Sequence, residues 1–373
     1  MNSKLSSALI GCILIFNSTD SAATLLLGSD LSGFSGVAGA ALIVSADSVV
    51  SDNLGAQAAI AVGARSETAD IYSSDGAVGT GDSGNSGDLY SGAAVSIAAN
   101  SNVKNVYAKD AVTLGASGST EDIYAGAAIT LGATSTSQNV YAAAAISGAG
   151  ADSISASYAT ANFISAYENT FDIDAALEQM ASAQESLYNL ETDFNLSTVM
   201  GDYTFEAGVY SGAALTIAAN SVIQFDGMGQ ENPIWVVNLN AALDVGAGTK
   251  FAIINAGAGA SVIWNLGGAL TLGAGSSFIG TAFITGAATG ATSDVTCGNL
   301  FTTAAIGIAS MTSTNCLATD TWAGSINGFA YNIDITDNII SNKSLSTVSE
   351  PPTSLMIFSV ALMFITIRAK RKS

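Results

Sequence analysis

The chain has 373 residues, of which only 11% are charged, and it carries a formal net charge of −20. It contains no histidine, so catalytic triads, metal sites and acid–base chemistry that depend on an imidazole ring are excluded. The acidic balance also argues against nucleic acid as a partner, because lysine and arginine are needed to neutralise phosphates.

Residues 1–23 are predicted to form a secretory signal peptide. Lys4 provides the positive flank, residues 5–16 form the apolar stretch, and small residues at 21–23 suit a cleavage site. An alternative is a lipoprotein signal in which Cys12 is acylated. After export, Cys297 and Cys316 are the remaining cysteines, and they form either a disulfide or two buried free thiols.

Residues 24–150 are predicted to form an N-terminal β-solenoid with coils of 17 residues. Tyrosines recur at positions 90, 107, 124 and 141. Each directly follows an aliphatic residue that is expected to be buried, and each precedes an aliphatic–Ser/Thr–aliphatic segment. Both segments alternate with period 2, as half-buried strands do. Less regular copies extend the pattern to seven coils, back to residue 37.

The alternation predicts two ladders of outward side chains on these coils, with rungs about 4.8 Å apart. The tyrosines form one ladder. Hydroxyl-bearing residues form the other: Ser96, Thr113, Thr130 and Ser147. Residues 73–88, rich in glycine, serine and aspartate, are interpreted as an inserted surface loop, with a calcium-binding loop as the alternative.

Residues 151–200 are predicted to contain one amphipathic helix, from about 172 to 190, that packs on the solenoid. Its apolar residues fall at helical spacing, and Asp172 or Asp174 can cap its start. The coil pattern resumes at Tyr203, and residues 201–316 are predicted to form wider, three-sided coils. There Thr216 and Thr271 occupy the ladder position.

Residues 317–349 are polar and are predicted to form an end cap followed by a linker. Residues 350–373 begin with Glu350-Pro351, continue with an apolar run at 355–367, and end with a basic cluster: Arg368, Lys370, Arg371 and Lys372. This tail resembles a PEP-CTERM sorting signal of Gram-negative bacteria, although Ser349 replaces the first proline. The resemblance implies cleavage by an exosortase after insertion of the tail into the membrane; a plain C-terminal membrane anchor is the alternative.

Four segments carry a more specific likeness: TFEAGVY at 204–210, IWVVNL at 234–239, VIWNLG at 262–267 and FIGT at 278–281. In order, they resemble the ice-binding-protein-like family of secreted microbial β-solenoids. The likeness covers roughly residues 25–45 and 155–310, so the 17-residue coils look like an expansion. It implies an all-β discontinuous β-helix, one long α-helix alongside it, and a flat outward face that binds ice.

The resemblance makes the hydroxyl ladder the candidate ice-binding site: Ser96, Thr113, Thr130, Ser147, Thr216 and Thr271. Ala61 and Asp244 interrupt this ladder. No cofactor or metal is expected, and the predicted partner is an ice surface.

The alternative function is a structural or adhesive component of a bacterial surface or exopolysaccharide matrix, in which the tyrosine ladder stacks on carbohydrate. A β-helix lyase is disfavoured because lyases of that fold use Lys/Arg bases. Residues 24–350 contain only Arg65, Lys104, Lys109, Lys250 and Lys343.

Overall fold

The computed structural model describes residues 24–26, 31–150, 154–159, 171–257, 259–290, 294–308, 310–311, 333–336 and 339–342. The expected signal peptide, the acylated Cys12 of its alternative, the sorting tail at 350–373 and Cys316 lie outside these residues, so they stay predictions. Within the described ranges, no helix is long and apolar enough to cross a membrane.

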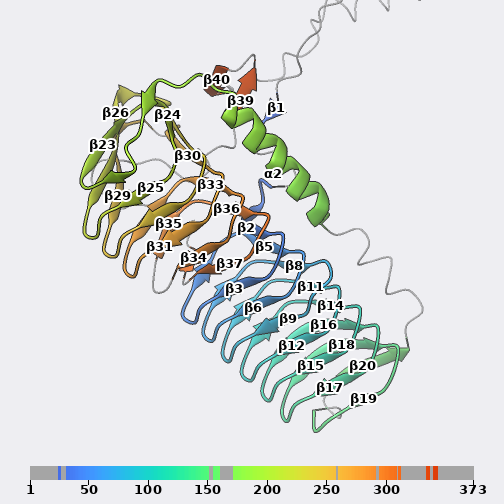
Figure 1. The fold of residues 1–373 in the computed structure, drawn as a ribbon. Coiled ribbons are helices and arrows are strands. Elements are labelled where there is room, and N and C mark those ends of the chain that lie inside the picture. The colour runs from blue at the N-terminus through green and yellow to red at the C-terminus, as the bar shows by residue number, and fades with distance from the viewer. Residues whose placement is uncertain are drawn as a thin grey trace, which may run out of the picture.

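The described residues form a β-solenoid of stacked, mostly parallel strands with a long helix beside it (Figure 1). This is the predicted fold class. Each complete coil contributes one short strand to each of three sides. We call the sides the ladder face, the tyrosine face and the third face, and we call the coils of residues 31–159 narrow and those of residues 194–311 wide.

The ladder face is a 13-stranded parallel sheet. Its strands, in spatial order, are β19 (Ile146–Ser147), β17 (Ile129–Leu131), β15 (Val112–Leu114), β12 (Val95–Ile97), β9 (Val78–Thr80), β6 (Ile60–Val62), β3 (Leu42–Val44), β37 (Ile306–Ile308), β34 (Ala288–Gly290), β31 (Leu270–Leu272), β28 (Leu243–Val245), β25 (Leu215–Ile217) and β22 (Val199–Met200).

The tyrosine face runs beside it along the whole solenoid. Its strands are β18 (Thr136–Ala142), β16 (Ser119–Ala125), β14 (Val106–Ala108), β11 (Leu89–Ser91), β8 (Ile71–Ser73), β5 (Asn53–Ala56), β2 (Phe34–Ala38), β36 (Leu300–Thr302), β33 (Thr281–Ile284), β30 (Ser261–Leu266), β27 (Ile234–Leu239), β24 (Gly208–Gly212) and β21 (Phe194–Asn195), with β20 (Ile154–Ala159) beyond β18.

The third face was not predicted for the narrow coils, where only two strands per coil were expected. It is formed there by β4 (Val49–Val50), β7 (Glu67–Thr68), β10 (Asn85–Ser86), β13 (Asn102–Val103) and the first residues of β16 and β18. It continues in the wide coils through β38 (Ser310–Met311), β35 (Asp294–Cys297), β32 (Ser277–Ile279), β29 (Lys250–Ala256), β26 (Val222–Gln230) and β23 (Tyr203–Glu206). These narrow-coil strands are only two residues long, too short for a period-2 pattern to reveal.

The narrow coils bury the aliphatic stacks that the sequence predicts. Leu89, Val106, Ile123 and Val140 are all 0% exposed and lie on successive strands in matching register. The stacks on the ladder face are equally buried, so each coil contributes aliphatic side chains to one continuous core.

Residues 73–88 are a regular coil, and the prediction of an inserted loop was wrong. Val78 pairs with Val95 and Asn85 pairs with Asn102, so both β9 and β10 continue the stack. The extra residue lies in the corner between Ser73 and Val78. Backbone hydrogen bonds hold this coil although glycine takes the place of a larger residue in β9. No group of three metal-ligating side chains occurs here or elsewhere among the described residues.

The wide coils have a larger, aromatic core, and they begin earlier than predicted. The first of them starts at Phe194 rather than at Tyr203. The sequence did not reveal this start, because β21 and β22 are two-residue strands that are mostly exposed and show no apolar alternation. Inside the wide coils, the indole nitrogens of Trp235 and Trp264 donate to backbone carbonyls at 3.1 Å and 2.8 Å. Three-sided wide coils were predicted and are present.

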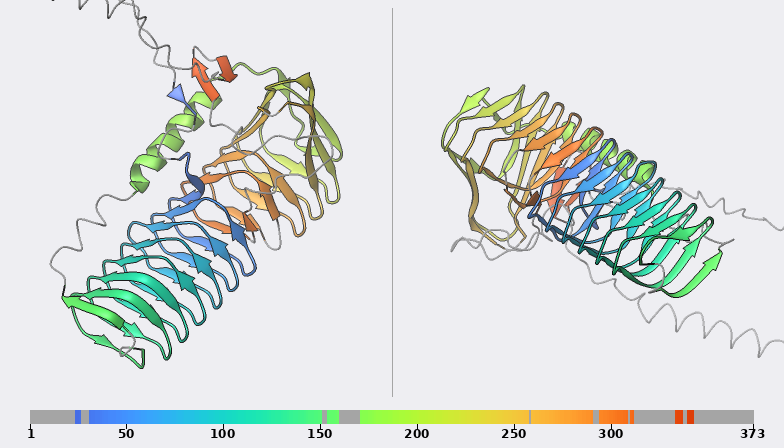
Figure 2. Two further views of the ribbon diagram at one scale, coloured as in Figure 1. Left: turned by 180° about the vertical axis from the view of Figure 1, so that it is seen from behind. Right: turned by 90° about the horizontal axis from the view of Figure 1, so that it is seen from below.

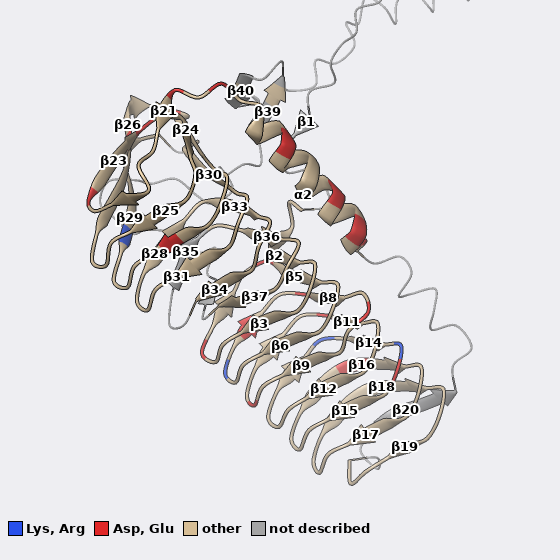
Figure 3. Cartoon of the chain, viewed as in Figure 1, with Lys and Arg blue, Asp and Glu red and all other residues tan. Residues whose placement is uncertain are grey.

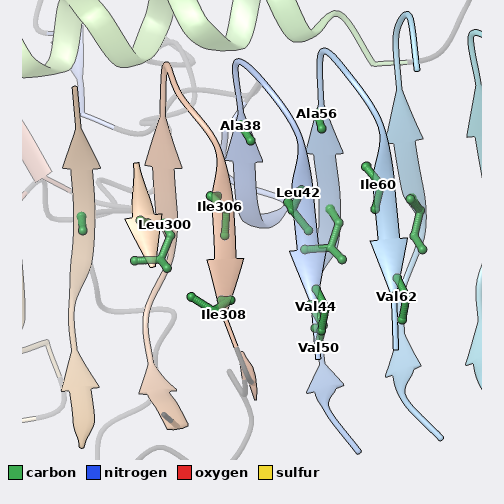
Figure 4. Close-up of a cluster of buried hydrophobic side chains, with 14 of the residues drawn as sticks. Ala38, Leu42, Val44, Val50, Ala56, Ile60, Val62, Leu300, Ile306 and Ile308 are labelled. Carbon is green, nitrogen blue, oxygen red and sulfur yellow. The ribbon is translucent and has the colours of Figure 1, made fainter. Parts of the chain in front are cut away.

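The solenoid is discontinuous in sequence. β3 pairs with β6 on one side and with β37 on the other, so the start of the chain stacks on the last wide coil. The chain therefore winds outward from the middle to β19 and β20. It then continues through the helix to the opposite end at β21 and winds back to the middle (Figure 1). The close-up of the junction shows Leu42 and Val44 beside Ile306 and Ile308 (Figure 4).

The helix α2 (Ile173–Tyr188) lies along the tyrosine face of the wide coils and of β2, the first narrow strand of that face (Figure 2). Asp172, one of the two predicted caps, is its N-cap, and its side chain accepts a hydrogen bond from the backbone nitrogen of Ala175 at 3.1 Å. The buried helix residues pack on outward side chains of that face: Val37, Val209, Val236, Ile263, Phe283 and Phe301.

Buried amides fix the helix on the sheet. Asn238 Nδ2 donates to the carbonyl of Leu187 at 2.8 Å, and Asn265 Nδ2 donates to the carbonyl of Gln184 at 3.1 Å. Separately, β1 (Thr24–Leu25) pairs antiparallel with β39 (Ile333–Thr336), which pairs with β40 (Ile339–Asn342). The predicted linker thus includes a strand.

Candidate functional site

The ladder face presents one outward residue per coil in a single row. In each three-residue strand the first and third residues point into the core and the middle residue points out, as in Val112-Thr113-Leu114. The row, in spatial order, is Ser147, Thr130, Thr113, Ser96, Gly79, Ala61, Ile43, Gly307, Thr289, Thr271, Asp244, Thr216 and Val199.

Four predicted residues form an uninterrupted group, which we call the narrow array: Ser96, Thr113, Thr130 and Ser147. All four are exposed. At about 4.8 Å per rung the array spans about 14 Å along the solenoid. Among the described residues, no protein group hydrogen-bonds to these hydroxyls, so they face water.

The second group, the wide array, contains Thr216, Asp244, Thr271 and Thr289 on adjacent strands. Thr216 and Thr271 were predicted from the sequence, and Asp244 was expected to interrupt the ladder, but Thr289 was not predicted. Thr289 lies between Ala288 and Gly290, so the aliphatic pair that marks the other ladder strands is absent. Asp244 and Thr271 are 27 residues apart but Thr271 and Thr289 only 18, so counting a constant coil length would not have found it.

A central stripe without hydroxyls separates the two arrays: Gly307, Ile43, Ala61 and Gly79. Ile43 protrudes, with 53% of its surface exposed. A Cβ atom added to Gly79 or Gly307 would meet nothing within 4 Å, so both positions open directly onto solvent. Of these four residues, only Ala61 was predicted from the sequence to interrupt the ladder.

The corners beside the ladder face repeat one backbone conformation. The residue three positions after each complete narrow ladder strand has φ between 56° and 61°: Asp47, Arg65, Ser83, Asn100, Ser117 and Thr134. This left-handed conformation is unusual for residues other than glycine, so its recurrence indicates that the tight corner demands it. Because every coil turns the same way after its ladder strand, the third-face strands that follow the corners run parallel to one another.

Charge is sparse on the ladder face. The strands of the narrow array, β12, β15, β17 and β19, carry no charged residue, whereas β28 carries Asp244 (Figure 3). At the neighbouring corner, the Arg65 guanidinium donates to both carboxylate oxygens of Asp47 at 2.6 Å and 2.7 Å. This pair lowers the pKa of Asp47 but lies outside the row.

The tyrosine ladder is present on the adjacent face, as predicted. Tyr72, Tyr90, Tyr107, Tyr124 and Tyr141 stack with ring centroids 4.5–5.0 Å apart and planes within 4° of parallel. Each ring therefore covers the faces of its neighbours. Since a sugar ring stacks on an open aromatic face, this geometry argues against carbohydrate stacking along the ladder.

The tyrosine hydroxyls lie near carboxylates of the same strands. Burial and the neighbouring Asp70 raise the pKa of Tyr72 to about 12, and burial and Asp122 raise the pKa of Tyr124 to about 12. Both phenols stay protonated at neutral pH, and each donates to its aspartate at 3.4 Å. In these two rungs the phenol is therefore held by an aspartate of its own strand.

Comparison with solved structures finds similar chains among ice-binding proteins. One from an Arctic yeast is 12% identical, with 78% of this chain and 94% of that chain covered and a TM-score of 0.42. One from Antarctomyces psychrotrophicus is 20% identical, with 52% and 91% covered and a TM-score of 0.35. One from Shewanella frigidimarina is 17% identical, with 56% and 90% covered and a TM-score of 0.32.

No curated protein matches the chain. The model of the Ice-binding-like family matches residues 97–314. The match includes the region 155–310 that the sequence resemblance covers and extends into the narrow coils, while residues 25–45 lie outside it. Because this match spans more than half of its 373 residues, the chain belongs to the Ice-binding-like family.

Proposed function

We propose that the protein is an exported, non-enzymatic ice-binding protein that contacts ice through the ladder face. The observation that carries the proposal is the narrow array, four adjacent exposed Ser/Thr rungs on a parallel sheet in a chain of the Ice-binding-like family. The predicted signal peptide and the tail at 350–373 are consistent with release or anchoring at the cell surface.

Side-chain chemistry supports this assignment. Threonine presents a methyl group and a hydroxyl together, so one rung can exclude loosely held water and hydrogen-bond to an ordered water molecule. Its β-branched side chain has few rotamers, which keeps both groups near fixed positions. Val112 and Leu114 on either side of Thr113 are 0% and 1% exposed, so the core holds the backbone of this rung.

The other two faces fit ice less well. On the third face of the narrow coils the outward residues include Glu67, and Asn102 Nδ2 donates to Asn85 Oδ1 at 3.0 Å. Such side chains are satisfied by each other or bind water around a charge. The tyrosine face is covered by α2 in the wide coils and is closed by stacked rings in the narrow coils.

The test is ice capture by the purified exported protein, measured as the fraction incorporated into a slowly growing ice shell, together with thermal hysteresis. The double variant T113Y/T130Y places two large rings on the narrow array and should reduce both signals strongly. The matched control N85Y/N102Y places the same rings on the third face, where both asparagines are exposed. Absence of capture by the unmodified protein would refute the proposal, and equal loss in both double variants would refute the assignment of the face.

A structural or adhesive role in a surface matrix is the second candidate, and the elongated solenoid favours it (Figure 1). A stiff spacer needs no ligand, so the matrix role predicts neither ice capture nor thermal hysteresis. Binding of extracellular polysaccharide in a pull-down, undiminished by Y107A, would favour an adhesive surface other than the tyrosine ladder.

A further inference from the structure

We infer that the ladder face carries two separate ice-contact arrays that act together, with the narrow array as the stronger one. The inference rests on the proposed function and adds how its site is divided. The narrow array belongs to coils that precede α2 in sequence, and the wide array belongs to coils that follow it. The discontinuous fold places both in one row.

The two arrays are far enough apart to be distinct. From Thr289 to Ser96 the row passes through four residues without hydroxyls, which is five rung steps. At about 4.8 Å per step this is about 24 Å, longer than either array. Ile43 stands in the middle of this gap with more than half of its surface exposed, so water there meets an aliphatic side chain.

The junction between the halves holds the arrays in fixed register. β3 and β37 pair as Leu42 with Ile306 and Val44 with Ile308, and these four side chains are 0–1% exposed. On the adjacent side, the buried Asn299 Nδ2 donates to the carbonyl of Phe34 at 2.6 Å. The backbone nitrogen of Gly39 donates to the carbonyl of Thr302 at 2.8 Å. The halves are therefore joined by a ladder of hydrogen bonds and a shared core.

Two weak sites on one rigid body bind a continuous surface far more tightly than either alone, because the second contact forms without a further loss of translational freedom. Linked sites commonly gain about 10²–10⁴-fold in apparent affinity over a single site. An ice surface is larger than the whole solenoid, so both arrays can engage it at once.

The arrays are unequal because of Asp244. This exposed residue lies between Thr216 and Thr271, so its carboxylate holds its own hydration shell in the middle of the wide array. The narrow array has no charged member. We therefore expect the wide array to contribute less until the charge is removed.

The experiment uses the full exported protein and measures ice-shell capture at a series of protein concentrations. T113Y and T271Y each obstruct one array, and T113Y/T271Y obstructs both. Each single variant should lower apparent affinity about 100-fold, with the larger loss for T113Y, and the double variant should fall to the background of a protein that does not bind ice. N102Y controls for the effect of adding a large ring elsewhere on the surface, and circular dichroism controls for folding of each variant.

Asp244→Thr in the T113Y background tests whether the Asp244 carboxylate weakens the wide array. This variant should raise ice capture above that of T113Y alone. E67T removes one exposed negative charge from the third face and should not raise it. Unchanged capture in T271Y, a fall of T113Y to the level of the double variant, or no gain from D244T would overturn the inference while the proposed function stands. No capture by the unmodified protein would instead refute the proposed function.

Discussion

Gly79 offers a direct test of the ladder-face reasoning, because threonine at this position would extend the narrow array from four rungs to five. Gly79 lies beside Ser96 and Ala61 in the row. A Cβ atom at this position would meet nothing within 4 Å, and the φ of Gly79 is not positive. The new side chain therefore fits without displacing any neighbour.

The expected change in the free energy of unfolding follows from replacing a glycine within a strand. Glycine costs about 0.5–1 kcal/mol of backbone entropy, and threonine favours strands within a scale of about 1 kcal/mol. G79T should stabilise the fold by about 1 kcal/mol, measured by chemical denaturation. The extended array should also increase ice-shell capture relative to the unmodified protein.

Gly81 provides the matched control in the same coil. A Cβ at this glycine would overlap the backbone nitrogen of Ala64 in the preceding coil. G81T should therefore destabilise the protein by about 1–3 kcal/mol, the usual cost of overpacking. If G79T were as destabilising as G81T, the outward placement of residue 79 would be refuted. If G79T were stable but left ice capture unchanged, the link between rung number and ice contact would fail.

Further predictions concern the helix, the tyrosine ladder and the tail. N238A removes the donor to the Leu187 carbonyl and the acceptor of Asn265 Nδ2 at 3.0 Å, so it should cost about 1–3 kcal/mol by denaturation, whereas the exposed N102A should change stability by less than about 0.5 kcal/mol. Because the folded pKa values of Tyr72 and Tyr124 are raised from 10.0 to about 12, the folded state is favoured below pH 10 and loses this contribution as the pH rises towards 12. Absorbance at 295 nm should show phenols ionising late and together with unfolding, and phenols that all ionise near pH 10 before unfolding would contradict the half-buried, stacked ladder. If residues 350–373 are a sorting signal, mass spectrometry of the exported protein should find a C-terminus near Glu350-Pro351, and E350A/P351A should retain the full tail; an intact tail on the unmodified exported protein would contradict it.

Much of the fold could be predicted because it depends on local patterns. The spacing of the tyrosines defines the coil length, and the period-2 alternation determines which residues of each strand point inward, such as Val112 and Leu114. The same alternation identifies the narrow array. Helical spacing and the aspartates at the start were sufficient to locate α2 and to narrow its cap to Asp172 or Asp174, of which Asp172 is the cap. These features arise from side-chain direction within a few residues, which the sequence records directly.

Features that depend on backbone pairing between coils could not be predicted in this way. The coil at 73–88 lacks the aliphatic pair because Thr80 takes the second inward position of β9, yet its hydrogen bonds to both neighbouring coils form regardless of side chain. Thr289 was missed for a similar reason, since Ala288 and Gly290 give no strand signal. The two-residue strands of the third face are too short to show any period.

The coil period, the helix and the narrow array can be derived from the amino-acid sequence, because each depends on residues close together in the chain. The family resemblance added the expectation of a discontinuous solenoid. The stacking of β3 on β37 is a property of the folded chain, because these strands lie more than 250 residues apart in the sequence. The two halves join here because the contact covers the apolar core at the edge of each half and pairs the backbone groups of the two edge strands. That contact places two hydroxyl arrays in one row with a gap of small and aliphatic residues between them.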